Sequence, residues 1–470
     1  MASLDTKFTG GNNGLKEFAA KQVAKQILPL VGRMSDKDLG RLLWLSRKLA
    51  PTEYTKSFID TLDRMRQEQH PTIELIRRMI RQTNPHVRQR LVNSLLINEL
   101  MRGNVIREQL RNQGLASPQA YLISPTMRCN LRCFGCYASS YSKKDDLESE
   151  VIDHVLTEGK NLGMFWVTIL GGEPFVRQDM WEIYKRHNDV FFQVYTNGTL
   201  IDKEAARKLA KVGNVLVIFS VEGFEEETDA RRGKGVFQKI MQGMDNLREV
   251  GVPFGFSVMV TRQNVDAIIS DEFNDMLMEK GCLIGWHFLY IPVGLNPDMS
   301  LMPTAEQREL MRRRGAQRIR NEKPIFIVDF WNDAPYVGGC IAGGRNYFHI
   351  NARGDVEPCI FVHLGVDNIK QKSLKEVINS PYFKAIRSRQ PYSDNLLRPC
   401  MIIDHPHVLR ELCRECRPYP TDGPVCELIT ALAGDLDRYS DEVAKILDMV
   451  WEEEFAVSKV DDQKSLVKPA

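Results

Sequence analysis

Long apolar runs are missing from this sequence. The 470-residue chain has only short apolar stretches such as Val215–Phe219, well below the ~18 residues of a membrane-spanning helix. Residues 1–14 lack a basic segment followed by an apolar one, so we expect no secretory signal. Internal repeats and low-complexity linkers are also absent. The composition, 43% hydrophobic and 26% charged, is that of a globular protein and excludes a disordered, collagen-like or integral membrane chain.

Cysteine is absent from the first 128 residues and is unevenly placed after them. Three of the ten cysteines lie between Cys129 and Cys136, Cys282 stands alone, and six lie between Cys340 and Cys426. Without a secretory signal we expect free thiols rather than disulfides, which predicts a cytoplasmic protein. Clustering of this kind favours metal chemistry.

Acidic residues are scarce near the N-terminus. Residues 1–120 hold 20 Lys and Arg against 11 Asp and Glu, whereas the rest of the chain holds 43 against 50. Such a basic segment can contact an anionic membrane peripherally. Alternatively, it is a solvated helical face docked onto the acidic body of the chain. Nucleic acid is not expected as a partner, because aromatic residues are few there and no nucleic-acid-binding motif is present.

Residues 1–116 read as a basic helical domain. Apolar residues between Leu15 and Leu30 recur at helical spacing, and Asp36 can cap a helix over Leu39–Leu49. Two more amphipathic helices are predicted, Pro71–Gln82 and Val87–Met101.

Between residues 117 and 330 the pattern changes to short β-branched or aromatic runs that alternate with helical stretches. The predicted strands are Tyr121–Ser124, Trp166–Leu170, Phe191–Tyr195, Val215–Ser220, Phe254–Val260 and Leu283–Tyr290, and the helices are 148–162, 203–212, 236–250 and 266–280. Alternation of this kind predicts an α/β fold with a parallel sheet, open or closed into a barrel. Ligand sites in such folds lie at the carboxyl ends of the strands. Residues 331–430 are loop-rich and cysteine-rich, and 431–470 read as an acidic helix around Tyr439–Phe455 and a tail.

Directly after the first predicted strand comes the segment Cys129-Asn-Leu-Arg-Cys133-Phe-Gly-Cys136. Three closely spaced thiolates can bind three irons of a cubane cluster and leave the fourth iron open. Structural zinc is the alternative, but it requires four ligands, and no fourth cysteine or histidine lies close by.

This segment resembles the Cys-x3-Cys-x2-Cys signature of the radical SAM superfamily, and the resemblance extends over residues 118–300. It implies a partial (β/α)6 barrel in which Cys129, Cys133 and Cys136 ligate a catalytic [4Fe–4S] cluster that binds S-adenosylmethionine. One electron, from a donor such as flavodoxin or ferredoxin, would cleave the cofactor to methionine and a 5′-deoxyadenosyl radical. Many members carry an aromatic residue just before the third cysteine. Here that residue is Gly135, and Phe134 and Tyr137 flank the site instead, so Tyr137 is the candidate cofactor contact.

Three further strand ends resemble cofactor-binding segments of the same family. Gly171-Gly172-Glu173-Pro174 is similar to the loop that holds the methionine amino group, although a Gly-Gly turn alone is a weak signal. Asn197, Ser220 and Glu222 match the ribose-contacting positions, with Glu222 where Asp is usual. Arg232 is then the partner of the methionine carboxylate, and the alternative is a surface ion pair with Asp229. Asn197 could equally be a turn residue that faces its own backbone.

The C-terminal cysteines resemble the SPASM/twitch extension, which carries auxiliary [4Fe–4S] clusters. Cys340 and Cys359 frame Gly354, and the remaining candidate ligands are Cys400, Cys413, Cys416 and Cys426. The full SPASM pattern has seven cysteines and this region has six, so we expect one auxiliary cluster. Two incompletely cysteine-ligated clusters, or a four-cysteine zinc or rubredoxin-like site, are the alternatives. We expect His405 and His407 to be loop residues and Cys282 a buried strand thiol.

The sequence thus predicts a radical SAM enzyme that abstracts hydrogen from an unactivated carbon. The SPASM-like region favours a peptide or protein substrate, and the basic helical domain favours a lipid. The rival interpretation is a non-catalytic iron–sulfur or zinc protein for electron transfer or interaction. It predicts cysteines without a cofactor pocket, against which the Gly171–Pro174 loop and the ordered strand ends argue.

Overall fold

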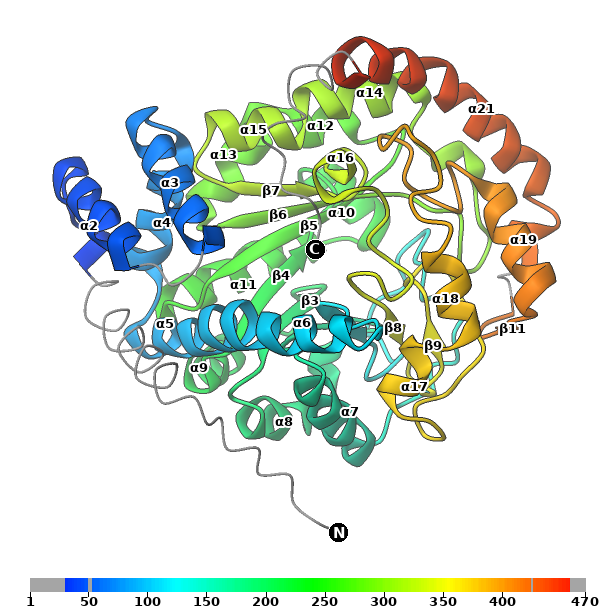
Figure 1. Cartoon of the computed structure of the whole chain (residues 1–470), viewed down its shortest axis with the longest axis horizontal. Coiled ribbons are helices and arrows are strands. Elements are labelled where there is room, and N and C mark those ends of the chain that lie inside the picture. The colour runs from blue at the N-terminus through cyan, green and yellow to red at the C-terminus, as the bar shows by residue number, and fades with distance from the viewer. Residues whose placement is uncertain (1–29, 50–52, 424–425, 457–470) are drawn as a thin grey trace.

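The computed structural model describes residues 30–49, 53–423 and 426–456, so nearly all of the helix predicted over residues 15–30 lies outside it. At its centre is a nine-stranded sheet with the order β7-β6-β5-β4-β3-β2-β1-β8-β9 (Figure 1). Strands β7 to β8 run parallel to their neighbours, and β9 is antiparallel to β8. The strands are β1 Ala120–Ile123, β2 Trp166–Ile169, β3 Phe191–Thr196, β4 Val215–Ser220, β5 Phe254–Val260, β6 Ile284–Leu289, β7 Phe326–Asp329, β8 His349–Ile350 and β9 Val356–Glu357.

The predicted α/β fold with a parallel sheet is confirmed, and each of the six predicted strands is present with bounds within one residue. Two further parallel strands extend the sheet beyond those six. β7 pairs with β6, and β8, from the segment predicted to be loop-rich, pairs with β1 through Leu122 and His349. A strand of two residues has no readable alternation, which explains why the sequence did not indicate β8.

Helices cover the outer face of the parallel strands, whose side chains there are apolar and fully buried, as at Val217 and Phe256. Gly243 lets α11 approach closely, because a Cβ built on it would lie 3.0 Å from Phe219 Cε1. The helix predicted over 266–280 is broken at Ser270, whose hydroxyl caps the second half. These helices are α7 Ser149–Asn161, α8 Met180–Arg186, α9 Lys203–Val212, α10 Glu225–Arg232, α11 Val236–Val250, α12 Val265–Ile269, α13 Asp271–Lys280, α14 Ala305–Arg314 and α15 Ala316–Glu322, with the short η2 Pro174–Val176 and η3 Met299–Leu301.

Of the N-terminal helices, α2 to α4 lie at the edge of the molecule away from the C-terminal segment, whereas η1 and α6 run across it toward β8 (Figure 1). Their basic residues dock mainly onto backbone oxygens rather than onto acidic groups: Arg78 donates to Pro324 O at 2.8 Å and to Met278 O at 2.9 Å. Arg107 forms a buried ion pair with Glu99 at 2.8 Å, and Glu99 Oε2 accepts from Phe165 N, next to β2. The predicted helix 87–101 is two segments, α5 and a π-helical η1. The elements are α2 Asp36–Leu49, α3 Glu53–Gln67, α4 Pro71–Gln82, α5 Pro85–Leu91, η1 Val92–Gly103 and α6 Asn104–Asn112.

The C-terminal segment packs beside β1 and closes over α14. Arg308 of α14 binds Asp404 at 2.6 Å in a fully buried pair, and Arg312 binds Glu454 at 2.8 Å. The predicted acidic helix begins earlier than expected and ends in a π-helical turn. The elements are α16 Ala334–Val337, β10 Leu364–Gly365, α17 Leu374–Ile378, α18 Pro381–Arg387, α19 Pro406–Cys416, β11 Tyr419–Pro420, α20 Cys426–Ile429, α21 Ala433–Val450 and η4 Trp451–Ala456. None of the helices within the described residues has the length and apolar character that crossing a bilayer requires.

Candidate functional site

The carboxyl ends of β1 to β4 meet at one edge of the sheet, as parallel pairing requires. The cysteine loop follows β1, the Gly171 turn follows β2, Asn197 follows β3, and Ser220 ends β4. The structure therefore brings together segments that are up to about a hundred residues apart in the sequence.

The cysteine loop holds three half-buried thiols, and Cys133 and Cys136 lie close enough to Cys129 to act on it electrostatically. Cys129 Sγ accepts a hydrogen bond from Leu131 N at 3.5 Å and one from Asn197 Nδ2 at 3.8 Å. Burial raises the pKa of the Cys129 and Cys133 thiols, and the nearby Arg232 acts in the opposite direction on Cys133. A thiolate in this loop therefore needs a cation to compensate for burial, which is the role an iron would fill.

The Gly171 turn is interlocked with the cysteine loop. Gly172 N donates to Thr126 O and Glu173 N to Arg128 O, both at 2.8 Å. A Cβ built on Gly172 would lie 2.1 Å from Arg128 O, so no other residue fits there. Gly171 has a φ of +108°, in the region that favours glycine. The two glycines thus allow the turn to pack directly against the chain that enters the cysteine loop.

Glu173 is a fully buried carboxylate at the centre of this interlock. Oε1 accepts from Phe175 N at 3.1 Å and Thr196 Oγ1 at 2.8 Å, and Oε2 accepts from Asn197 N at 2.8 Å. Burial raises its pKa to about 7 in spite of these three hydrogen bonds. A carboxylate has about four acceptor positions, so Glu173 retains capacity for one further donor such as an ammonium group.

Asn197 makes the local turn contact and also reaches the cysteine loop. Its Oδ1 accepts from Thr199 N at 3.0 Å, which is a local turn contact. Its Nδ2 donates to Asn130 Oδ1 at 2.8 Å and approaches Cys129 Sγ, so the same side chain also faces the cysteine loop. Asn130, inside the loop, carried no sequence signal.

Glu222 and Arg232 contact each other, which the sequence did not indicate. Glu222 Oε1 accepts from Arg232 Nε at 2.8 Å and Nη2 at 2.5 Å, and it also binds Arg231. Both partners of this pair are nearly inaccessible, so the alternative of a surface pair between Arg232 and Asp229 is wrong. Asp229 instead accepts from the backbone of Gly235 and Phe237. The adjacent arginines were the available sign that two guanidinium groups converge here.

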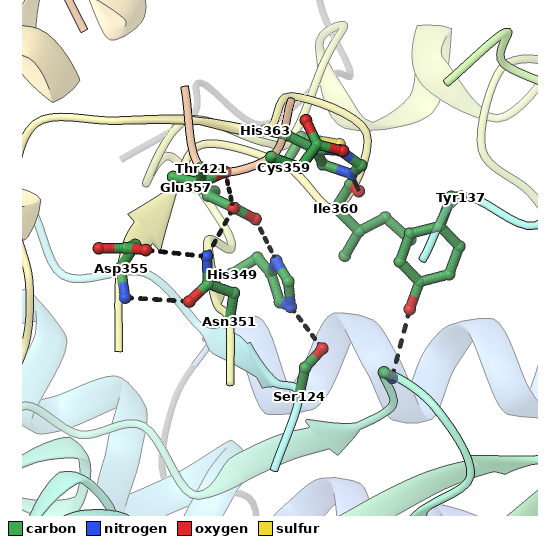
Figure 2. A network of polar contacts seen from close by, with 12 residues as sticks. Ser124, Tyr137, His349, Asn351, Asp355, Glu357, Cys359, Ile360, His363 and Thr421 are labelled. Atoms are coloured by element: carbon green, nitrogen blue, oxygen red, sulfur yellow. Dashed lines mark hydrogen bonds and ion pairs between the residues drawn. The ribbon is translucent and has the colours of Figure 1, made fainter. Parts of the chain in front are cut away.

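Tyr137 and Ser220 complete the predicted set. The Tyr137 hydroxyl accepts from Gly171 N at 3.3 Å (Figure 2), so the residue after the third cysteine contacts the glycine turn directly. Ser220 is partly buried at the end of β4 and pairs with Ser257 of β5.

The C-terminal cysteines form two groups. Cys340, Cys359 and Cys400 lie in mutual electrostatic range around Tyr347, whose hydroxyl is 3.2 Å from Cys359 Sγ. Burial raises the pKa of the Cys340 thiol to about 12. The second group, on the last turns of α19, contains Cys413 and Cys416, and the side chain of Cys426 lies outside the described residues.

The histidines near α19 differ from the prediction of two loop residues. His405 is the buried N-cap of α19, where its Nε2 bonds to Arg398 O at 2.8 Å, and His407 lies within that helix. Cys282 is fully buried as predicted, but it precedes β6 rather than lying in a strand. Within the described residues, no three His, Cys, Asp or Glu side chains come close enough to hold a single metal ion.

The donor set fits an iron–sulfur cluster with a bound cofactor. The three thiols of the cysteine loop are soft ligands on one short loop, and a glycine cradle and a buried carboxylate with spare acceptor capacity lie next to them. The buried thiols around Tyr347 fit an auxiliary cluster by the same chemistry.

Comparisons with known proteins agree with this geometry. The family model of the radical SAM superfamily matches residues 123–271, and that of the iron–sulfur cluster-binding SPASM domain matches residues 340–417. The chain is 32% identical over 224 residues to Fe-coproporphyrin III synthase of Methanosarcina barkeri, covering 45% of this chain and 56% of that one. It is 37% identical over 262 residues to the mycofactocin maturase MftC of Mycolicibacterium smegmatis, covering 53% and 66%.

The chain thus spans less than two thirds of the length of each of these relatives. Among solved structures, Streptococcus suis SuiB bound to precursor peptide SuiA superposes with a TM-score of 0.53 at 19% identity, over 68% of this chain and 76% of that one. This similarity concerns the fold. The chain therefore contains a radical SAM domain, matched over residues 123–271, and an iron–sulfur cluster-binding SPASM domain, matched over residues 340–417.

Proposed function

We propose that this protein reductively cleaves S-adenosylmethionine and abstracts hydrogen from an unactivated carbon of a peptide, protein or lipid. The two matched domains imply a catalytic [4Fe–4S] cluster, S-adenosylmethionine and auxiliary iron–sulfur chemistry. Cys129, Cys133 and Cys136 would hold the cluster, which in its reduced form would supply the one electron needed for reductive cleavage of a carbon–sulfur bond of the cofactor. The observation that carries the proposal is the interlock of the cysteine loop with the Gly171 turn and the buried Glu173 carboxylate.

Each residue of the site has a proposed task. Cys129, Cys133 and Cys136 each bind one iron. The Gly171–Glu173 turn accepts the methionine ammonium group, for which Glu173 has a remaining acceptor position. We assign the ribose contacts to Asn197, Ser220 and Glu222. We assign the aromatic contact with the cofactor to Tyr137.

Arg232 is assigned to the methionine carboxylate. Its Nε and Nη2 bind Glu222, and we assign Nη1 to the cofactor. Because Glu222 is fixed by two arginines, its orientation is set before the cofactor arrives, which lowers the entropic cost of binding.

We propose one auxiliary cluster with ligands drawn from the six C-terminal cysteines. The partly buried group Cys340, Cys359 and Cys400 supports this assignment best, because Cys340 lies close enough to both other thiols to interact electrostatically with them. Cys413, Cys416 and Cys426 supply the remaining candidate ligands.

For the domains we propose the bounds 1–116, 117–330, 331–430 and 431–470.

We infer a substrate with an apolar portion from the side chains on the inner face of the sheet, the face that the outer helices leave uncovered. Along β6, the buried residues Gly285, His287 and Leu289 lie on the outer face, and the partly exposed Trp286 and Phe288 lie on the inner face. The rings of Trp286 and Phe288 stack with their centroids 6.0 Å apart. The Phe288 ring centroid also lies 5.1 Å from that of Phe330 and 6.1 Å from that of Tyr195. This face suits an alkyl chain or an apolar side chain of a peptide.

A peripheral membrane contact is proposed through α2. Trp44 and Leu45 are 59% and 49% exposed, and Lys48 Nζ lies 3.7 Å from the Trp44 ring centroid. Arg41 and Arg47 lie on the same helix. Exposed aromatic and basic groups on one amphipathic helix suit an anionic lipid surface. We place the protein in the cytoplasm, with an electron donor such as flavodoxin or ferredoxin.

The test is anaerobic incubation of the reconstituted protein with dithionite and S-adenosylmethionine, first alone and then with peptide and lipid extracts from cells that lack the protein. We expect 5′-deoxyadenosine, with more of it when the substrate-bearing extract is present. The extract that stimulates cleavage identifies the substrate class. Cofactor that remains intact under all conditions would favour a non-catalytic iron–sulfur protein instead.

A further inference from the structure

A set of buried polar contacts joins the C-terminal segment to Ser124, which follows β1 beside the turn after β2 (Figure 2). His349 lies at its centre, with Nε2 2.7 Å from Ser124 Oγ and Nδ1 2.6 Å from Glu357 Oε2. The side chains of Ser124, His349 and Glu357 are fully buried. We call these three residues the Ser–His–Glu relay.

The C-terminal end of the relay is firmly held. Glu357 Oε1 accepts from Tyr141 Oη at 2.7 Å, from Asn351 Nδ2 at 2.9 Å and from Thr421 Oγ1. These donors come from the loop after the cysteines, from the turn after β8 and from the end of β11. Several charge-assisted hydrogen bonds therefore fix the carboxylate, and the carboxylate fixes the imidazole of His349.

The other end of the relay reaches the cofactor turn. Ser124 lies near Tyr137, whose hydroxyl accepts from Gly171 N at 3.3 Å. Gly171 also packs on Ser124 directly, because a Cβ built on Gly171 would lie 2.8 Å from Ser124 Cβ. Tyr137 follows Cys136 in the sequence. A displacement of Ser124 would therefore move the glycine turn and the end of the cysteine loop together.

A serine, a histidine and a carboxylate in this order also occur in nucleophilic triads, but that use is excluded here. A nucleophile attacks a substrate that lies against its hydroxyl, whereas the Ser124 hydroxyl packs against Gly171: a Cβ built on Gly171 would lie 3.1 Å from Ser124 Oγ. The same hydroxyl is already engaged with His349. The arrangement is suited to hold geometry rather than to attack a substrate.

We propose that His349 and Glu357 are positioning residues for S-adenosylmethionine. Through Ser124 and Tyr137 they hold the Gly171 turn in the geometry that receives the methionine end of the cofactor. The carboxylate that anchors the relay lies two residues before Cys359, so correct folding of the cysteine-rich segment sets the cofactor affinity of the core. This inference rests on the proposed function, because it requires that the Gly171 turn binds the cofactor.

Three variants test the relay against one matched control. Ser124→Ala removes the hydroxyl that contacts His349, and Tyr137→Phe removes the acceptor for Gly171 N. His349→Phe removes the contacts of the imidazole with Ser124 and with Glu357. The control is His187→Phe, because His187 is also a buried histidine paired with a carboxylate, Asp153 at 2.9 Å, but it lies on the outer layer. The equilibrium dissociation constant of S-adenosylmethionine is measured anaerobically on reconstituted protein, with iron content and melting temperature in parallel.

We expect each relay variant to weaken cofactor binding by roughly 2- to 30-fold with unchanged iron content. The control should lower the melting temperature without changing cofactor affinity. The double variant Ser124→Ala/His349→Phe should lose less affinity than the product of the single losses, since both changes interrupt one path. The change in the electron paramagnetic resonance spectrum of the reduced cluster upon cofactor addition should decrease in the same order.

The outcomes separate this inference from the function on which it rests. Wild-type protein that holds iron but does not bind S-adenosylmethionine would overturn both. Wild-type binding with unchanged affinity in Ser124→Ala and Tyr137→Phe would overturn the relay alone. Those two variants decide the question even when His349→Phe fails to fold, because each removes only a hydroxyl group.

Discussion

At the scale of single residues, Glu173 shows how one side chain can serve both structure and chemistry. Glutamine would keep the size of Glu173 and one acceptor, yet the structure indicates that the replacement also affects folding. Both carboxylate oxygens accept hydrogen bonds from protein groups, so an amide nitrogen in place of either oxygen would lose at least one of them.

Glu173→Gln should therefore weaken S-adenosylmethionine binding by roughly 10- to 100-fold and also lower stability by about 1–3 kcal/mol. The first effect comes from the lost charge opposite the ammonium group, and the second from an unpaired buried group. Titration with the cofactor and thermal unfolding of the same preparation measure the two effects. The control is Glu182→Gln on α8, whose carboxylate is 69% exposed. Equal cofactor affinity in both variants, with full iron content, would refute the assignment of this turn.

At the scale of elements, the N-terminal helices are attached to the sheet at a small number of buried points. The pair of Arg107 and Glu99 is the least exposed of these, at 3% and 0%. Removal of one partner from a buried ion pair leaves an uncompensated charge. The guanidinium also donates to Gly163 O in the turn between α7 and β2, so it ties α6 to that turn.

Arg107→Ala should lower the free energy of unfolding by about 3–5 kcal/mol without changing the iron content of the folded fraction. Denaturant titration measures the first quantity and iron analysis the second. Lys185→Ala, which removes an exposed pair with Glu182, serves as the control and should leave stability unchanged. A stability equal to that of the control would contradict the view that this pair docks the helices.

The exposed face of α2 leads to a prediction about membranes. Trp44→Ala should reduce binding to vesicles of anionic lipid several-fold, because the indole is the largest exposed apolar group on that helix. Vesicle flotation with anionic and neutral lipids makes the comparison, and Tyr336→Ala, a similarly exposed aromatic on α16, is the control. Equal binding to both lipids by wild-type protein would contradict the proposed contact.

At the scale of the whole molecule, the sequence predicted those features of the fold and the site that depend on residues close together in the chain. The strand bounds followed from β-branched runs, and the cysteine loop from the spacing of Cys129, Cys133 and Cys136. The sequence could not reveal contacts made by tertiary packing, such as Ser124 with His349, which lie 225 residues apart. The pair of Glu222 with Arg232 was hidden for a related reason: each residue had a plausible local role, and only the folded α10, which ends at Arg232, returns that residue to the end of β4.

The cysteine loop and the C-terminal cysteines should bind iron independently of each other, because they lie on separate parts of the chain. In the variant with Cys129, Cys133 and Cys136 all replaced by Ala, we expect the loss of about four irons per chain. Iron bound through Cys340–Cys426 should persist. Metal analysis after anaerobic purification decides this, and zinc in place of iron in the C-terminal segment would favour the four-cysteine alternative.

The most direct measurement is the yield of 5′-deoxyadenosine from S-adenosylmethionine and dithionite, compared between the wild-type protein and this triple-cysteine variant under anaerobic conditions. Each thiolate of the cysteine loop is proposed to anchor one iron of the cluster that supplies the electron. The wild-type protein should therefore form 5′-deoxyadenosine and the variant none. Formation of 5′-deoxyadenosine by the variant at the wild-type rate would contradict the assignment of the catalytic cluster to the loop after β1.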